Sequence, residues 1–323
     1  MKVVIVGYGS IGKRHFKNFS SKTHDNISIC TKRNDVPKNI KTYKTIKECL
    51  KQKPDIAIIT NETDKHLKSA IKFASIGCHI FIEKPLSNSS EGIQKLEKII
   101  HQKKIITQIG CNLRFNPCLI KIKKILSEKK IGKIISFQAE HGTYLPDWHP
   151  TEDYSKTYAA KKNKGGSVVL TSIHEIDYLY WFFGIPLEVF ANIGKYSDLN
   201  ISSDDHSSLF LKFKNGIIGE IHLDYYQKPK TRTCKIIGTK GTIFWDNEKN
   251  TVKIFQFKTQ KLKTMLKISK FDINQMYLDE IKHFKNCIKY KKSTINDVKQ
   301  GKDTLNIALS ALKSSKTKRV VEI

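Results

Sequence analysis

The amino-acid sequence predicts an N-terminal α/β domain with a doubly wound parallel sheet, and a C-terminal α+β domain with a large, mostly antiparallel open sheet flanked by helices. Two patterns predict these domains. Up to about residue 110, short apolar runs alternate with helical patterns, as in β–α–β units. From about residue 120, successive strand candidates are joined by tight turns, which pair strands antiparallel. A chain of 323 residues is long enough for two hydrophobic cores.

The N-terminal domain is expected at residues 1–118. Its strand candidates are residues 2–6, 27–30, 55–60, 79–82 and 105–109. Helical patterns separate them at residues 13–20, 45–51, 64–76 and 90–102. Gly77 ends the third helical pattern, and Ser87 or Asn88 can cap the fourth helix.

A glycine motif follows the first strand, with the sequence Gly7-Tyr8-Gly9-Ser10-Ile11-Gly12. In a strand–turn–helix unit the first glycine permits the turn, the second lets the backbone approach a pyrophosphate, and the third lets the helix pack on the strand. The N–H groups at the helix start, around Ser10 and Ile11, attract phosphates. Glycines also mark ordinary turns, but the strand before and the helix after favour a dinucleotide-binding Rossmann domain.

The end of the second strand bears on the choice between NAD and NADP. NAD-binding domains often place Asp or Glu there to accept the ribose hydroxyls. This chain has Thr31, Lys32 and Arg33 instead, and Asp35 comes slightly late. A hydroxyl and two cations suit the extra phosphate of NADP, so we expect NADP rather than NAD. The alternative is that Lys32 and Arg33 are solvated loop residues.

The C-terminal domain is expected at residues 119–323, with the last helix able to pack back on the first domain. Its strand candidates are residues 134–141, 188–193, 207–214, 217–225, 233–237, 242–245 and 252–257. Helical patterns lie at residues 117–129, 173–183, 274–289 and 301–313. Asn215-Gly216 predicts a hairpin. Apolar residues on both alternations of residues 207–225 indicate that both sheet faces are covered, so we expect a homodimer or homotetramer through this sheet.

The net charge of +28 leaves three interpretations open. The basic residues could bind nucleic acid, attract an anionic substrate and cofactor, or reflect compositional drift towards lysine. Lysine is spread along the whole chain, and arginine occurs only at positions 14, 33, 114, 232 and 319. Because sequence-specific nucleic-acid readers depend on arginine, drift is favoured and no specific nucleic-acid partner is expected.

The seven cysteines are scattered without a CxxC pair. This spacing is typical of reduced thiols in the cytoplasm and predicts no metal site. No apolar run is long enough for a membrane span, and the chain start lacks the apolar core of a secretory signal, so no membrane partner is expected.

A reactive lysine candidate follows the fourth strand, in Glu83-Lys84-Pro85. Doubly wound sheets place reactive groups at the carboxyl ends of their strands. Partial burial and a nearby positive nicotinamide ring would both lower the pKa of Lys84 towards acid–base use. The alternative is that Lys84 is one more surface lysine.

Five motifs in order resemble the Gfo/Idh/MocA oxidoreductase family, named after glucose–fructose oxidoreductase, inositol dehydrogenase and a rhizopine-catabolism protein. They are the glycine motif with His15, Thr60-Asn61 with His66, Glu83-Lys84-Pro85, residues 112–117 (NLRFNP), and Gly165-Gly166 with His174-Glu175-Ile176-Asp177. The resemblance covers nearly the whole chain and implies a nicotinamide cofactor, with the substrate between the domains.

The resemblance also implies residue roles. Lys84 transfers a proton and Glu83 orients it. His174 faces Lys84 across the substrate and holds or deprotonates a sugar hydroxyl, the alternative being a hydrogen-bonded core histidine. Arg114 lies near the cofactor at the domain junction. The residues that line the nicotinamide half of the site are Thr60, Asn61 and His66.

The chain departs from the family near His174, because many members carry Asp three or four residues earlier. Here those positions hold Thr171 and Leu170. A threonine can hold a hydroxyl but is no base at neutral pH, so the proton chemistry falls to Lys84 and His174.

The aromatic segment 144–154 is expected to be a substrate loop, because flat rings stack on sugars and polar groups bond hydroxyls. Its expected substrate contacts are Tyr144, His149 and Tyr154. The alternative is a structural crossover in which Trp148 and Tyr154 fill a core. Further candidates for the same pocket are Tyr225, Tyr226 and Arg232.

The sequence thus predicts an NAD(P)-dependent dehydrogenase or reductase acting on a CH–OH group of a sugar, sugar derivative or nucleotide sugar. Two other classes remain open. A non-catalytic sugar or cofactor sensor on the same fold is suggested by Thr171, and a nucleic-acid-binding protein only by the charge. The sequence names neither the carbon oxidised nor the reaction direction.

Overall fold

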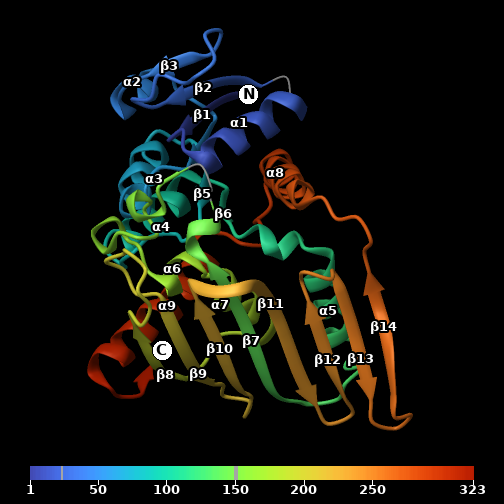
Figure 1. The fold of residues 1–323 in the computed structure, drawn as a ribbon. Helices are drawn as coiled ribbons and strands as arrows, with labels where there is room; N and C mark the ends of the chain where they lie inside the picture. The colour runs from blue at the N-terminus through green and yellow to red at the C-terminus, as the bar shows by residue number, and fades with distance from the viewer. Residues whose placement is uncertain (23–24, 149–151) are drawn as a thin grey trace. The chain divides into compact units, whose positions relative to one another are not determined.

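The structure is a computed structural model that describes residues 1–22, 25–148 and 152–323 (Figure 1). His149, one of the expected substrate contacts, lies outside these residues. The described chain forms two compact units, each built from two segments. Unit 1 comprises Met1–Asn112 and Ile273–Leu305, and unit 2 comprises Leu113–Asp272 and Asn306–Ile323.

Unit 1 contains a parallel sheet of six strands in the order β3-β2-β1-β4-β5-β6. The chain leaves the central strand β1 in one direction through β2 and β3, and in the other through β4, β5 and β6, so the topological switch point lies between β1 and β4. The strands are β1 (Lys2–Val6), β2 (Asn26–Cys30), β3 (Lys41–Tyr43), β4 (Ile56–Ile59), β5 (His79–Glu83) and β6 (Thr107–Gly110). The predicted doubly wound parallel sheet is confirmed, and β3 is an addition to the five expected strands.

Four of the helices in unit 1 follow the predicted alternation, and a fifth comes from residues that were expected in the C-terminal domain. They are α1 (Ser10–Lys22), α2 (Ile46–Lys51), α3 (His66–Ala74), α4 (Ile93–Lys103) and α8 (Ile273–Tyr290). Helix α8 comes from the second segment and supplies Ile281 and Phe284 to the core cluster that also contains Val3, Ile5 and Phe81. These side chains are at most 5% exposed, so burial of α8 contributes to the stability of unit 1.

Unit 2 contains a sheet of nine strands in the order β14-β13-β12-β11-β7-β10-β9-β8-β15. Its neighbouring strands are antiparallel, except that β10 runs parallel to β7. The strands are β7 (Ile134–Tyr144), β8 (Glu188–Gly194), β9 (His206–Lys212), β10 (Ile218–Asp224), β11 (Tyr226–Gly238), β12 (Gly241–Asp246), β13 (Thr251–Gln256), β14 (Lys261–Lys267) and β15 (Val321–Glu322). The mostly antiparallel open sheet is therefore confirmed.

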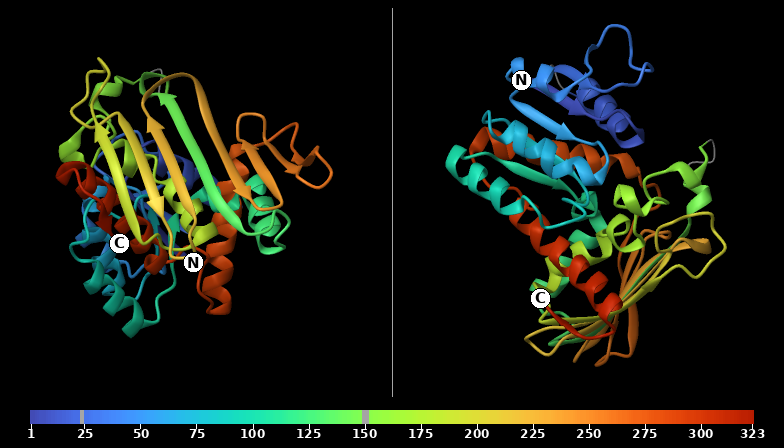
Figure 2. Two further views of the ribbon diagram at one scale, coloured as in Figure 1. Left: turned by 90° about the horizontal axis from the view of Figure 1, so that it is seen from below. Right: turned by 90° about the vertical axis from the view of Figure 1, so that its left-hand side faces the viewer.

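Helices of unit 2 pack against one face of this sheet (Figure 2). They include α5 (Pro117–Ser127), α6 (Val168–Thr171) and α7 (His174–Phe183), while α9 (Val298–Thr317) starts in unit 1 and ends in unit 2. On the helix-covered face Phe137 stacks on Phe183 at 5.2 Å. On the other face Phe190, Phe210 and Phe244 are 41–53% exposed. The sheet thus has one packed face and one open face.

All seven cysteines are buried and carry thiols. Across the described residues, no helix combines the length and apolarity needed to span a bilayer. The same residues contain no group of three or more His, Cys, Asp or Glu side chains placed to hold a metal ion.

Candidate active site

The glycine turn lies between β1 and α1, at the carboxyl end of the parallel sheet. Gly7 has φ +101°, and a Cβ there would lie 2.7 Å from the carbonyl oxygen of Thr60. A Cβ on Gly12 would lie 2.4 Å from the carbonyl oxygen of Gly7. Gly9 by contrast has open space where a Cβ would point. The first and third glycines are therefore required by packing, while the second leaves the backbone accessible to a ligand.

The side chain of Thr60 fixes this turn from the end of β4. Its hydroxyl lies 3.0 Å from each of two carbonyl oxygens, those of Val6 and Gly7, and donates to them. Thr60 thereby joins the two central strands at the switch point, where ligands of such sheets bind.

His66 connects the end of β4 to the segment after β5. Its Nδ1 lies 2.8 Å from the carbonyl oxygen of Pro85, and its Nε2 lies 3.0 Å from that of Asn61. The ring is 2% exposed. Burial lowers the pKa of His66, and the two carbonyl contacts act in the opposite direction. The side-chain amide of Asn61 donates to Ser69 at 3.0 Å. His66 therefore links the backbone of Pro85, which directly follows Lys84, to the backbone of Asn61 after β4.

Glu83 is a buried carboxylate at the last position of β5. Its Oε1 lies 2.6 Å from Nε2 of His15, which comes from α1, and its Oε2 accepts the backbone N–H of Lys84 at 3.2 Å. A Cβ on Gly110 would lie 3.0 Å from this carboxyl group, so the neighbouring strand also confines it. The carboxylate thus links the helix that follows the glycine turn to the backbone of Lys84, whose side chain is half-buried.

The segment after β2 presents the residues that bear on cofactor choice. Arg33 donates two hydrogen bonds to Asp35, at 2.9 Å and 3.0 Å, and Lys13 of α1 lies 2.7 Å from the same carboxylate. These cations hold the pKa of Asp35 well below its usual range. Thr31 accepts the backbone N–H of Arg33 at 3.1 Å, and Lys32 is exposed. An acidic residue therefore accompanies the cations that were expected to face an NADP phosphate.

In unit 2, His174 is the first residue of α7 and is 9% exposed. Thr171 lies just before it, buried at the end of α6. Arg114 is 1% exposed and forms two hydrogen bonds with Asp177 of α7, at 2.9 Å and 2.8 Å. This ion pair fixes the start of α7 from inside unit 2, and a contact between Arg114 and the cofactor stays a prediction.

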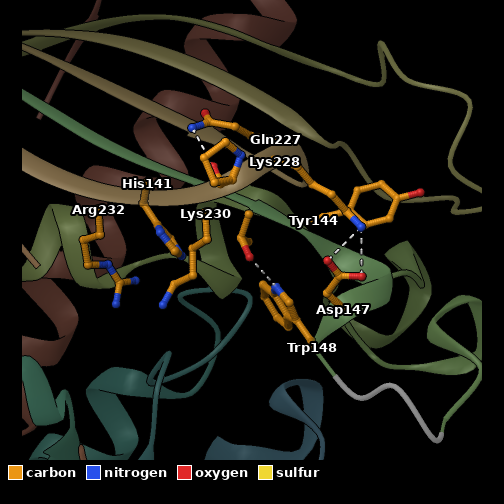
Figure 3. Close-up of a pocket in the computed structure, with 10 residues that line it drawn as sticks. His141, Tyr144, Asp147, Trp148, Gln227, Lys228, Lys230 and Arg232 are labelled. Carbon is orange, nitrogen blue, oxygen red and sulfur yellow. Dashed lines mark hydrogen bonds and ion pairs between the residues drawn. The ribbon is translucent and has the colours of Figure 1, made fainter. Parts of the chain in front are cut away.

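Unit 2 also holds a pocket of about 450 Å³ between the end of β7 and the start of β11 (Figure 3). It is lined by His141, Thr143, Tyr144, Asp147, Trp148, Gln227, Lys228, Pro229, Lys230 and Arg232. The pocket brings together Tyr144 and Arg232 from the expected substrate residues. Tyr154 is placed differently, because its hydroxyl accepts the backbone N–H of Asn200 at 3.1 Å. Trp148 donates to Thr143 at 3.0 Å and packs on Tyr225, as the crossover alternative described.

Sequence reasoning named His15 only as part of a motif and missed His141, Lys228 and Lys230. The histidine of α1 stands in the family motif, but only the packing of α1 on β5 shows that it contacts Glu83. The two lysines could not be distinguished among the many lysines of the chain.

The comparison with known proteins agrees with this geometry. Residues 1–111 match the family model described as an oxidoreductase family with an NAD-binding Rossmann fold. Residues 119–244 match the C-terminal domain model of the same family, Gfo/Idh/MocA. The chain belongs to the Gfo/Idh/MocA family and is an oxidoreductase with an NAD-binding domain. The family, the fold class and the enzymatic nature predicted from the motifs are thereby confirmed.

Two relatives illustrate the similarity at the sequence level. Myo-inositol 2-dehydrogenase of Thermotoga maritima is 26% identical, with 100% of this chain and 98% of that protein covered. Levoglucosan dehydrogenase of Pseudarthrobacter phenanthrenivorans is 27% identical over 61% of this chain and 57% of that protein.

Solved structures are similar along the whole chain. Levoglucosan dehydrogenase in complex with NADH and L-sorbose has a TM-score of 0.89 at 18% identity, covering 100% of this chain and 98% of that one. An oxidoreductase domain protein of Kribbella flavida has a TM-score of 0.90 at 16% identity, covering 100% and 99%. At these identities the likeness shows the fold.

Proposed function

We propose that the protein is an NAD(P)-dependent dehydrogenase or reductase that transfers a hydride between the nicotinamide and a secondary alcohol or ketone of a sugar, sugar derivative or nucleotide sugar. The observation that carries this proposal is that the accessible turn at Gly9 and the fixed backbone of Lys84 lie at the same edge of the parallel sheet. The match of this domain to the family model supports it. The relatives named above are inositol and levoglucosan dehydrogenases, which supports a polyol or sugar substrate.

The residues present fit a dinucleotide. The accessible backbone at Gly9 and the N–H groups of Ser10, Ile11 and Gly12 at the start of α1 would hold the pyrophosphate. Thr60, Asn61 and His66 would line the nicotinamide half. When bound, the cofactor supplies the acceptor or donor of the hydride.

The proton chemistry is assigned to Lys84 and His174. In the oxidative direction the Nζ atom of Lys84 would accept the proton of the substrate hydroxyl, and Glu83 would orient Lys84 through its backbone. His174 would hold or deprotonate a sugar hydroxyl from unit 2, next to Thr171. The remaining substrate contact we propose is Tyr144, which lines the pocket, whereas the hydroxyl of Tyr154 holds the backbone of Asn200.

The residues that follow β2 bear on the preference for NADP or NAD. We assign NADP in preference to NAD, because two cations and a hydroxyl follow β2. One structural neighbour, from Desulfitobacterium hafniense, is described as NADPH-dependent. Asp35 weakens this preference, because it occupies the guanidinium of Arg33.

The test of the proposed function begins with a thermal-shift screen of NAD, NADP and a panel of sugars, followed by turnover of the best pair. We expect Lys84→Met to lower kcat by at least about 100-fold, because a general acid–base residue contributes about 10²–10⁴-fold. Cofactor binding, measured by nicotinamide fluorescence, should stay nearly unchanged in this variant. Normal turnover by Lys84→Met would overturn the catalytic assignment.

We also propose that the protein forms a homodimer or homotetramer through the open face of the sheet in unit 2. Exposed aromatic side chains on that face support self-association. A cytoplasmic location is proposed from the seven buried thiols, which suit a reducing compartment.

A further inference from the structure

We propose that the substrate is an anionic sugar, and that its carboxylate or phosphate is bound in the unit 2 pocket by Lys228, Lys230 and Arg232. The inference rests on the proposed function and makes its substrate class more specific. Among the described residues that line the pocket, four are basic and one, Asp147, is acidic (Figure 3). A volume of about 450 Å³ falls in the range of small-molecule sites.

A bulge in β11 forms the wall that carries the two lysines. On the neighbouring strand β7, Tyr144 pairs with Tyr226 and Gly142 pairs with Thr231. Residues 227–230 of β11 therefore stand opposite the single residue Thr143. The excess chain must leave the plane of the sheet, and bulges of this kind often re-aim side chains next to functional sites.

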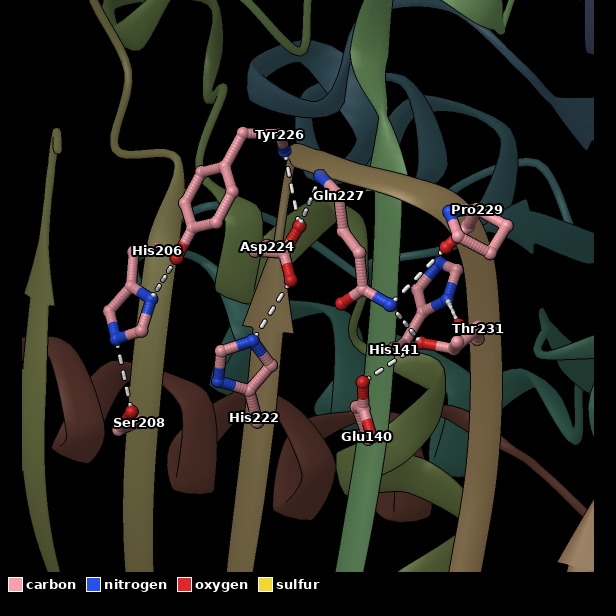
Figure 4. A network of polar contacts seen from close by, with 10 residues as sticks. All are labelled: Glu140, His141, His206, Ser208, His222, Asp224, Tyr226, Gln227, Pro229 and Thr231. Atoms are coloured by element: carbon pink, nitrogen blue, oxygen red, sulfur yellow. Dashed lines mark hydrogen bonds and ion pairs between the residues drawn. The ribbon is translucent and has the colours of Figure 1, made fainter. Parts of the chain in front are cut away.

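Polar side chains hold the bulge at both ends (Figure 4). At its start, the buried carboxylate of Asp224 accepts the backbone N–H groups of Tyr226 at 3.1 Å and Gln227 at 2.9 Å. At its end, the side-chain amide of Gln227 donates to the hydroxyl of Thr231 at 2.7 Å. A Cβ on Gly142 would lie 2.1 Å from the amide oxygen of Gln227, so a larger residue there would displace the side chain that holds the end of the bulge. A wall fixed in this way is ordered before a ligand binds, which lowers the entropic cost of binding.

The lysines of this wall can exchange their present partners for a ligand. Lys228 lies 3.0 Å from Asp147, with side chains 58% and 59% exposed, and Lys230 lies 3.1 Å from Glu248, with side chains 46% and 44% exposed. Exposed ion pairs contribute little to stability, so a carboxylate or phosphate that meets both lysines can replace them.

Arg232 is the deepest cation of the pocket and connects it to α7. Its side chain is 14% exposed, and its Nε lies 2.8 Å from the fully buried carboxylate of Glu175. This ion pair holds the guanidinium beside Glu175, and the N–H groups of the guanidinium can donate to a ligand. Glu175 directly follows His174, the residue proposed to hold a sugar hydroxyl. An anion bound by Arg232 therefore lies next to the start of the helix that carries the proposed sugar contact.

His141 completes the same side of the pocket. Figure 3 shows its ring turned to the side on which the charged ends of Lys230 and Arg232 lie. Its Nδ1 lies 3.1 Å from the carbonyl oxygen of Thr231, and since a carbonyl only accepts, Nδ1 carries a proton. A neutral polyol would leave these cations with their carboxylate partners in the protein, whereas an anionic sugar can bind to them directly.

The test compares sugars that share the glucose ring and differ in the neutral or anionic group at C6. We would measure the affinity for glucose, glucuronate and glucose 6-phosphate by calorimetry with saturating reduced cofactor, and then turnover of each. We expect at least one of the two anionic sugars to bind at least about tenfold more tightly than glucose. This difference in affinity should shrink as salt rises from about 50 to 500 mM. The glucuronate and phosphate arms distinguish a carboxylate from a phosphate.

The double variant Lys228→Met/Lys230→Met should reduce this difference by most of its size, with Arg232 accounting for what remains. Lys261→Met/Lys263→Met is the matched control, because it removes two exposed lysines at the same spacing from β14 and should preserve the difference. Equal binding of neutral and anionic sugars by the wild type would overturn the inference, as would equal effects of the two double variants. Selective anion binding without nicotinamide-dependent turnover of any sugar would instead overturn the proposed function and leave the anion site standing.

Discussion

At the scale of single residues, the buried carboxylate of Glu83 is the group on which the local geometry of Lys84 depends. A carboxylate only accepts hydrogen bonds, so Nε2 of His15 donates to Oε1 of Glu83 across 2.6 Å. Both side chains are at most 8% exposed, so neither can replace its partner with bulk water.

This pairing predicts a loss of stability in His15→Phe. The substitution removes the donor and leaves an oxygen of Glu83 buried without it, which costs about 1–3 kcal/mol. The free energy of unfolding, measured in urea, should fall by that amount, whereas His15→Gln, which keeps a donor, should lose less. An unchanged urea midpoint in His15→Phe would show that the contact carries no stability.

Arg33 and Asp35 make a second residue-scale prediction, about the cofactor. Arg33→Ala should lower kcat/KM for NADP by about tenfold, as expected for loss of a charged hydrogen bond, with little effect on NAD. Asp35→Asn should have the opposite effect, because it removes a negative charge that remains ionised at neutral pH and competes for Arg33. Steady-state kinetics with both cofactors measure the two ratios. An NADP to NAD ratio unaffected by either change would favour the solvated-loop alternative for Arg33.

At the scale of elements, regular patterns were predictable and exceptions to them were not. The Asn215-Gly216 hairpin is present, with Gly216 at φ +82° and antiparallel β9 and β10. Strand β14 was missed because lysines at 261, 263 and 267 hide a short edge strand, and charged residues are common on such edges. The bulge of β11 was missed because it is defined by pairing with β7, which local sequence does not encode.

The network behind that bulge predicts a pH dependence of stability. The hydrogen bond to Asp224, at 2.9 Å, raises the pKa of His222, and burial acts against it. Glu140 also raises this pKa, and the neighbouring His206 has its own pKa lowered by burial and by His222. A histidine whose pKa is raised in the folded state stabilises the fold below its unfolded pKa of about 6.5. This contribution is lost as the pH rises through the folded value.

We therefore expect His222→Gln to destabilise unit 2 more at about pH 5.5 than at about pH 9. Urea unfolding of both proteins across this range, followed by tryptophan fluorescence, gives the difference directly. Lys261→Gln, on the edge strand, controls for the loss of a positive charge elsewhere in the same sheet. A difference between wild type and His222→Gln that is constant with pH would contradict the role of the pair.

At the scale of the whole molecule, the two classes of sheet were predictable but the division of the chain was not. Residues 273–305 were assigned to the second domain, yet they form part of unit 1, where α8 contributes Ile281 and Phe284 to the core. The amphipathic pattern of α8 shows that it must be buried, but not against which sheet. Contacts between residues far apart in the sequence decide that point. The glycine turn was likewise predictable because a motif marks it, whereas the pocket wall at Lys228 was not, because strand pairing builds it.

The open face of the sheet in unit 2 carries a transverse row of side chains that favours a second copy of the chain as its partner. Successive strand registers define the row as Phe190, Phe210, Glu220, Gln138, Lys235, Phe244 and Lys253. A two-fold axis through Gln138 would place Glu220 of each copy opposite Lys235 of the other, and Phe210 opposite Phe244. The five inner positions of the row, from Phe210 to Phe244, are thus self-complementary in charge and in apolar surface, as an isologous interface requires.

Charge reversal tests this arrangement. Glu220→Lys or Lys235→Glu alone would place like charges opposite each other twice in a dimer and should shift the mass measured by light scattering towards that of one chain. The double variant Glu220→Lys/Lys235→Glu reverses both members and should restore the assembly.

Because each chain carries a net charge of +28, long-range repulsion opposes association, so the dimer should strengthen as salt rises from about 50 to 300 mM. Ile76→Glu, at a 43% exposed site of unit 1, should leave the mass unchanged. A wild type that is monomeric at every salt concentration, or a double variant no better than the single ones, would exclude this face as the interface.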